Sequence, residues 1–143
     1  MPAVKREKEM AVSVQSLYLA ITNFEDYPKF LPEVVGARRH EGGNLEKTLV
    51  TFELEVMKRF EYTLEFSMKL NQEVKWKLID SNFFKTNSGR WFLKPKGDKK
   101  TEVEYELDVS FGFLVPGWIS RKLTEVSLPK MFECFETQAG KIK

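Results

Sequence analysis

Few side chains in this sequence have the chemistry of a catalyst or a metal ligand. His40 is the only histidine, and a catalytic or metal-binding histidine needs a partner, which no spacing in the sequence fixes. Its neighbours Arg38, Arg39 and Glu41 indicate a surface position instead. Cys134 is the only cysteine, which excludes an internal disulfide and a zinc cluster built from cysteines. We expect it to be a small buried side chain on the last helix.

Acidic side chains are numerous, and two carboxylates in a dry cleft can perform acid–base catalysis. Here they alternate with bulky apolar residues, so along a strand they point away from the core. We interpret them as a solvated outer face, on which Lys75 and Lys77 form ion pairs across strands. The carboxylates in this pattern are Glu53, Glu55, Glu61, Glu65, Glu102, Glu104, Glu106 and Asp108. The sequence therefore predicts no catalytic residue and no metal site.

Length and composition predict one globular domain over residues 1–143. Apolar residues make up 42% and charged residues 31% of the chain, as in ordinary folded domains. The formal net charge of +2 lacks the basic excess of a dedicated nucleic-acid binder, so DNA is not an expected partner. The N-terminus lacks the apolar core of a secretory signal, and no apolar run reaches the length of a membrane span. We expect a cytoplasmic protein, with peripheral contact to the inner membrane as a further option.

The first elements are a strand over about 4–12 and a helix over 14–24. Ser13 is a good N-cap, and apolar residues recur at helical spacing from Leu17 to Phe24. The helix must end before Pro28, because a proline disfavours helical geometry at the preceding residue, Tyr27. Pro32 then confines 28–32 to a short turn or a single helical turn.

The middle of the chain reads as strands over 45–56, 60–70, 74–78, 88–94 and 102–111. Each alternates between bulky apolar and polar residues, and short turns such as Asn71-Gln72 join them. This order predicts an antiparallel meander with one buried face and one wet face.

The last segment, from Pro116 to Ala139, predicts a long helix with a fault in its apolar pattern. Ile119, Leu123 and Val126 share one stripe. A second stripe, which is rotated by roughly half a turn, contains Leu128, Phe132, Phe135 and Ala139. Pro129 lies where the phase changes, so we expect a kink there, or a helix with apolar partners on two sides.

A large sheet with one apolar face and a single long apolar helix predicts an α+β fold in which the sheet wraps around that helix. A curved sheet cannot pack its whole face onto one helix without leaving space. We therefore expect an internal apolar cavity.

Three motifs in order carry a family resemblance that covers nearly the whole chain. They are Tyr27-Pro28-Lys29-Phe30-Leu31-Pro32, Ser88-Gly89-Arg90-Trp91-Phe92-Leu93 and Thr101-Glu102-Val103-Glu104-Tyr105-Glu106-Leu107. With them the chain resembles the coenzyme-Q-binding START-like group. This group belongs to the polyketide cyclase/dehydrase-like, SRPBCC or Bet v 1-like superfamily, which includes ribosome-association toxin-like proteins. Relatives often carry an aromatic residue after the second proline, where this chain has Glu33.

The resemblance implies a helix-grip fold, in which about seven antiparallel strands hold the C-terminal helix around a tunnel-like cavity. It implies a non-enzymatic carrier or chaperone of a hydrophobic ligand, such as ubiquinone, menaquinone or a fatty acid, in support of respiratory quinone function. Two alternatives stay open. Toxin-like relatives imply association with the large ribosomal subunit, and cyclase or aromatase relatives imply an enzyme.

The predicted ligand-binding residues come from the apolar strand faces, the proline motif and the last helix. Arg90 is included as a candidate for holding a polar ligand head, with a surface position as the alternative. Trp118, in the apolar connection 113–118, is either core or a gate that touches a membrane while the ligand enters. The full set is Tyr27, Phe30, Leu31, Phe52, Leu54, Phe66, Met68, Trp76, Leu78, Arg90, Trp91, Tyr105, Val109, Trp118, Phe132 and Phe135.

Overall fold

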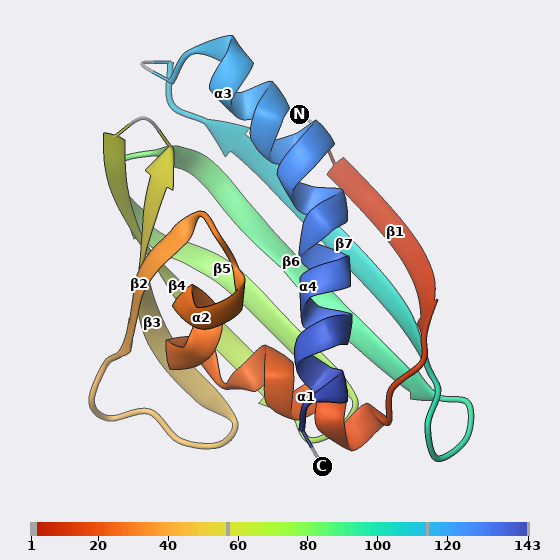
Figure 1. Ribbon diagram of the computed structural model, residues 1–143. Coiled ribbons are helices and arrows are strands. Elements are labelled where there is room, and N and C mark those ends of the chain that lie inside the picture. Colours follow the sequence, from red (N-terminus) through yellow and green to blue (C-terminus); the bar gives the residue numbers. More distant parts are fainter. Residues whose placement is uncertain (1–2, 57, 114, 143) are drawn as a thin grey trace.

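The computed structural model describes residues 3–56, 58–113 and 115–142, and its main element is one curved antiparallel sheet (Figure 1). The sheet has seven strands in the order β1-β7-β6-β5-β4-β3-β2. The strands are β1 (Ala3–Met10), β2 (Val34–Arg39), β3 (Lys47–Val56), β4 (Lys58–Lys69), β5 (Glu73–Ser81), β6 (Phe84–Pro95) and β7 (Thr101–Phe111). Figure 1 shows the long C-terminal helix lying across the concave face of this sheet. The predicted fold class, a helix-grip α+β fold, is confirmed.

The strands form because bulky side chains alternate with polar ones. In β3 the inward side chains of Val50, Phe52, Leu54 and Val56 are buried. Turns with left-handed residues close the neighbouring hairpins. Asn71, with φ 58°, turns β4 into β5, and Gly97, with φ 127°, turns β6 into β7.

The short helices after β1 follow the predicted order, but the first helix ends at Thr22 instead of Phe24 and Tyr27 is helical. Helix α1 (Val14–Thr22) begins at Ser13, whose hydroxyl accepts a hydrogen bond from the Ser16 N–H at 3.1 Å. A 3₁₀ turn (Phe24–Asp26) and helix α2 (Tyr27–Phe30) follow. Tyr27 has helical angles, φ −52° and ψ −41°, so its predicted exclusion from the helical region was wrong. Its phenol donates a 2.6 Å hydrogen bond to the Ile21 carbonyl and holds it there against the preference imposed by Pro28.

The C-terminal helix explains the fault in the apolar pattern. It runs as α3 (Gly117–Arg121), a π-helical segment (Lys122–Ser127) and α4 (Leu128–Gly140). The Leu128 N–H donates to the Leu123 carbonyl, five residues back. A π turn adds one residue, so the step from Leu123 to Leu128 keeps both residues on the same face of the helix. Val126 lies off this stripe and is 48% exposed, which corrects its predicted position.

Aromatic rings fill one half of the space between the sheet and α4. The ring centroid of Phe132 lies 5.0 Å from that of Tyr105 and 5.7 Å from that of Trp91. Phe135 packs on Trp91 at 5.1 Å and on Phe30 at 5.1 Å. These edge-to-face contacts fix the last turns of α4 against the sheet.

Gly89 in β6 allows two parts of the fold to approach closely. A Cβ at this position would overlap the carbonyl oxygen of Glu106 on β7 and would lie 2.7 Å from the ring of Trp76 on β5. The glycine of the Gly-x-Trp motif therefore makes room for the Trp76 indole on the inner face.

The substitution Gly89→Ala should reduce the free energy of unfolding by about 1–3 kcal/mol, because the new methyl group must displace backbone or the Trp76 ring. Chemical denaturation would measure the change. Gly112→Ala is the control, since a Cβ there would make only an ordinary 3.6 Å contact. Equal effects of the two substitutions would contradict the close approach.

Candidate ligand-binding cavity

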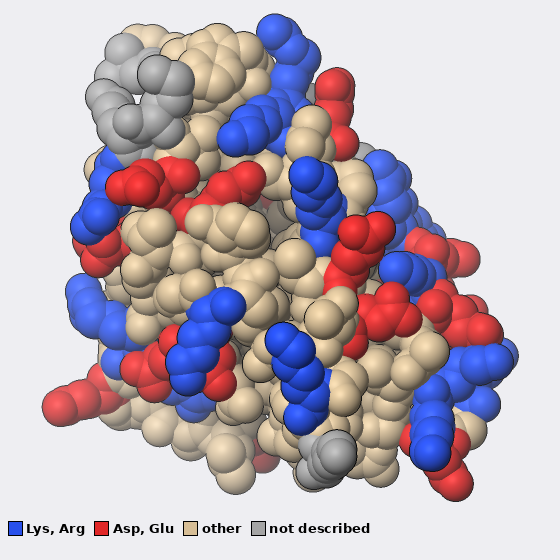
Figure 2. Space-filling model, in the orientation of Figure 1, with Lys and Arg blue, Asp and Glu red and all other residues tan. Residues whose placement is uncertain are grey.

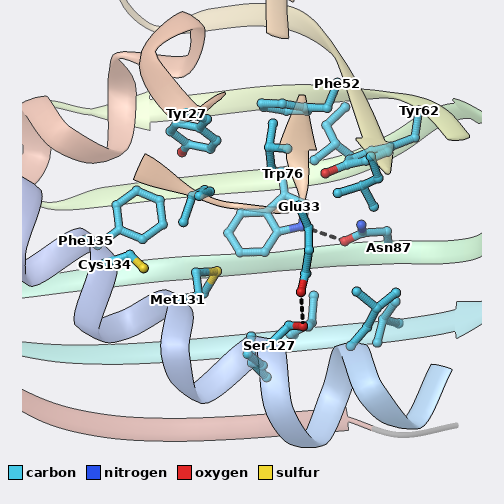
Figure 3. Close-up of a pocket in the computed structure, with 18 of the residues that line it drawn as sticks. Tyr27, Glu33, Phe52, Tyr62, Trp76, Asn87, Ser127, Met131, Cys134 and Phe135 are labelled. Carbon is cyan, nitrogen blue, oxygen red and sulfur yellow. Dashed lines mark hydrogen bonds between the residues drawn. The ribbon is translucent and has the colours of Figure 1, made fainter. Parts of the chain in front are cut away.

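A cavity of about 280 Å³ lies between the other half of the sheet and the C-terminal helix (Figure 3). An apolar cavity of about 150 Å³ in another protein holds benzene, so this space can take a larger guest. The cavity walls come from the inner sheet face, from the connection between α2 and β2, and from the helix between Leu123 and Phe135.

The walls are mainly aromatic and aliphatic. The Tyr27 ring stacks on Phe52 at 5.4 Å and meets Phe135 edge-on at 5.3 Å, which closes one end. Trp76 and Phe66 lie side by side on the sheet with centroids 6.3 Å apart. Such a surface stabilises a guest by excluding water from both partners.

Three polar groups interrupt the apolar sheet wall. The Trp76 indole N–H donates to Asn87 Oδ1 at 2.9 Å, and Asn87 is only 8% exposed. The hydroxyls of Tyr62 and Tyr105 belong to residues that line the same cavity. Within the described part of the chain neither hydroxyl has a hydrogen-bond partner. Burial raises the pKa of both phenols, and each stays a neutral group at physiological pH.

A hydrogen bond joins the two sides of the cavity mouth. Ser127, in the π-helical segment, donates to Glu33 Oε1 at 2.6 Å, and Glu33 lies between α2 and β2 (Figure 3). Met131 and the exposed Lys130 complete this side. Cys134 also lines the cavity, and burial together with the negative charge of Glu133 raises the pKa of its thiol.

Most of the residues predicted as ligand-binding lie on the cavity wall. They are Tyr27, Leu31, Phe52, Leu54, Phe66, Trp76, Trp91, Tyr105, Val109 and Phe135. The strand periodicity and the helix stripe place them there, because both patterns identify inward side chains.

Four predicted apolar residues lie outside the cavity. Phe30 and Phe132 belong to the filled, aromatic half of the core, and Met68 is buried within that core. Leu78 is partly buried against it. Periodicity identifies the inward face of a strand or helix but not which inward side chains lie beside the cavity. It therefore could not separate these four residues from those that line the cavity.

Arg90 and Trp118 are placed elsewhere. Arg90 lies on the outer face, 33% exposed, and forms ion pairs with Glu73 at 3.4 Å and Glu106 at 3.2 Å. It therefore does not reach the cavity, and Trp91 is the inward member of that pair. Trp118 is 47% exposed at the start of α3, near Phe113, which is 94% exposed. Leu114, part of the same predicted gate, lies outside the described residues.

Sequence reasoning missed Asn87, Glu33 and Ser127. Asn87 is two residues before Gly89 and four before the inward Trp91, so the same alternation points it inward. The predicted strand began at 88, whereas β6 begins at Phe84. Glu33 and Ser127 are separated by 94 positions in the chain, and no local pattern reveals their contact.

The other side chains that could in principle act in catalysis lie outside the cavity and contact neighbouring strands. His40 Nε2 lies 2.6 Å from Thr51 Oγ1. Lys77 pairs with Glu65 across β4 and β5 at 3.4 Å, as predicted for the outer face. Lys75 instead pairs with Glu73 of its own strand at 3.8 Å, so the predicted cross-strand pair of Lys75 was wrong. In the described ranges no group of three His, Cys, Asp or Glu side chains could hold a metal ion. No helix among these residues has the length and apolar character needed to cross a membrane.

Comparison with known families agrees with this architecture. Residues 10–136 match the family described as polyketide cyclase/dehydrase and lipid transport. The chain belongs to this family. Its sequence is also similar to the ribosome association toxin RatA of Escherichia coli K12, with 25% identity over 135 residues that cover 93% of this chain and 78% of that protein.

Two solved structures have the same fold as this member of the polyketide cyclase/dehydrase and lipid transport family. A START superfamily protein from Mycobacterium smegmatis superposes with a TM-score of 0.80 at 21% identity, covering 99% of both chains. The Zhui aromatase/cyclase from Streptomyces sp. R1128 gives 0.81 at 11% identity, covering 98% of this chain and 94% of that one. At these identities the likeness establishes the helix-grip fold.

High pH should destabilise the folded protein through its tyrosines. Burial raises the pKa of Tyr18, Tyr27, Tyr62 and Tyr105 in the folded state. The unfolded chain ionises its tyrosines near pH 10, so the stability from these neutral phenols is present below about pH 10 and is lost as the pH rises above it. Denaturation at a series of pH values would measure the loss. Phenolate absorbance that appears near pH 10 while the fold is intact would contradict it.

Proposed function

We propose that this protein is a non-enzymatic carrier or chaperone that holds one hydrophobic small molecule in the cavity between its sheet and its C-terminal helix. The observation that carries the proposal is the cavity itself, about 280 Å³ in volume and lined mainly by rings and aliphatic side chains. Membership of a family described by lipid transport as well as by cyclase and dehydrase activity supports it.

A quinone or another lipid with a ring or chain suits this space. Flat faces of Phe52, Phe66 and Trp76 line the cavity, and aromatic faces stack well on a ring. Aliphatic side chains such as Leu54, Leu64 and Leu123 offer contact to a chain. Ubiquinone, menaquinone and fatty acids are therefore the ligands to examine.

Binding without chemical conversion is the favoured mode. The carboxylate on the cavity wall belongs to Glu33, which accepts the Ser127 hydrogen bond at the mouth. The raised pKa of the Cys134 thiol disfavours the nucleophilic thiolate form. The half-exposed Trp118 and the exposed Phe113 support a transient contact with a membrane surface during loading, since such side chains favour the interface.

Filling the cavity should weaken ligand binding while leaving the fold intact. Val109 lines the cavity from β7, and Val109→Phe would occupy the ligand's volume. We expect saturable quenching of Trp76 and Trp91 fluorescence by an alkylated naphthoquinone in the wild type, and at least about tenfold weaker binding in the variant.

Val35→Phe is the matched control, because Val35 is exposed on β2 and lies outside the cavity. The quinone should also be recovered unchanged after incubation. Absence of saturable binding of both the quinone and palmitate would refute the carrier function. Conversion of the ligand that disappears in Glu33→Gln would favour a cyclase-type enzyme instead.

A ribosome-associating module is the second candidate, and the similarity to RatA favours it. If this chain binds the large subunit, it should cosediment with purified large subunits at low salt and dissociate as the salt concentration rises. Val109→Phe separates the two candidates, since a surface contact would survive filling of the cavity. A chain that never cosediments at low salt would rule out this candidate.

A further inference from the structure

The orientation of the Asn87 side chain is fixed by Trp76. An indole N–H can only donate a hydrogen bond, so the amide oxygen of Asn87 must face it, at 2.9 Å. The amide NH₂ group then has to point the other way. Figure 3 shows the Asn87 nitrogen directed away from Trp76, on the side of the pocket where the Tyr62 hydroxyl lies.

This NH₂ group is an unused donor on the cavity wall. Asn87 is 8% exposed and lines the cavity, and its nitrogen has no partner among the described residues. A ligand that displaces water from this group has to offer an acceptor, because a donor that loses water without gaining a partner costs free energy. Tyr105 is 4% exposed and lines the same cavity, as does Tyr62, and the hydroxyls of these two residues are further groups able to donate.

The charges around the cavity determine which acceptor fits. Among the described residues that line it, the basic side chain is Lys130, which is exposed, and the acidic one is Glu33 at the mouth. A carboxylate placed against Asn87 would be a buried anion without a cation, which is costly. A neutral oxygen would carry no such penalty.

We propose, on the basis of the carrier function above, that the cavity selects a neutral apolar molecule with a carbonyl oxygen and binds it with this oxygen against Asn87. The Asn87 NH₂ donates to the carbonyl, and the Tyr62 or Tyr105 hydroxyl supplies a second donor. The ring of the ligand lies by Trp76, and its chain leaves past Glu33 and Ser127. A free fatty acid binds more weakly, with its carboxylate at the mouth near Lys130.

A pair of probes tests this arrangement directly. The probes are a heptyl naphthoquinone and the heptylnaphthalene of the same ring size and chain, which has no carbonyl. Calorimetric titration should give the quinone about fivefold or more tighter binding. The infrared carbonyl band of the bound quinone should lie below its position in an alkane solvent, as hydrogen bonding requires.

Asn87→Leu removes the donor at nearly constant volume. It should weaken quinone binding about fivefold, leave heptylnaphthalene binding unchanged and return the carbonyl band toward its alkane position. Asn82→Leu is the matched control, because Asn82 is exposed between β5 and β6 and does not line the cavity. If the loss of the Trp76 bond unfolds Asn87→Leu, the infrared band of the wild type decides the question alone.

The outcomes separate this inference from the carrier function. Equal binding of both probes with an unshifted carbonyl band overturns the role of Asn87 but leaves the carrier intact. Palmitate that binds as tightly as the quinone overturns the selection for a neutral ligand. Failure of every probe to bind overturns the carrier function itself.

Discussion

The packing of one helix against a seven-stranded curved sheet is the constraint on which the rest of this structure depends. The sheet presents a wider apolar face than α4 can cover. Where the last turns of α4 bring Phe132 and Phe135 onto Trp91 and Tyr105, rings interlock and the core is solid. From Ile119 to Met131 the sequence of the helix has no aromatic residue, and a cavity of about 280 Å³ remains.

The π turn and the Glu33–Ser127 hydrogen bond fit the C-terminal helix to the part of the sheet that borders the cavity. A regular helix from Leu123 onward would rotate Leu128 and the residues after it away from the sheet. The five-residue step keeps the apolar stripe inward, and Pro129 favours it because it has no N–H for the carbonyl four residues earlier. The same segment places Ser127 beside Glu33, so the irregular turn also positions the polar part of the mouth (Figure 3).

Charged side chains lie on the outer face of the sheet, and the cavity wall formed by the sheet is apolar with a few neutral polar groups. Figure 2, which views the molecule from the side of the C-terminal helix, shows blue and red side chains interspersed over that surface. On the outer face of the sheet, Arg90 forms an ion pair with Glu106 at 3.2 Å. Among the described sheet residues that line the cavity, the polar groups are neutral. Gly89 admits the Trp76 ring, Trp76 orients Asn87, and Asn87 offers its amide to the cavity. The missing side chain of Gly89, the position of the Trp76 ring and the direction of the Asn87 amide are thus linked along β5 and β6.

The sequence by itself determined the strands other than β2, their inward faces, most of the helix stripe and the fold class, because side-chain periods of two and of about 3.6 residues are local properties of the chain. It also placed Trp91 and Phe135 on the inner surface and the carboxylates on the outer one. Only the tertiary structure decided which inward residues surround empty space, since Phe66 and Met68 share the inward face of β4 and only Phe66 lines the cavity. It alone brought Glu33 to Ser127 and Trp76 to Asn87, because contacts between distant segments follow from sheet curvature and close packing, which leave no periodic signal in the sequence.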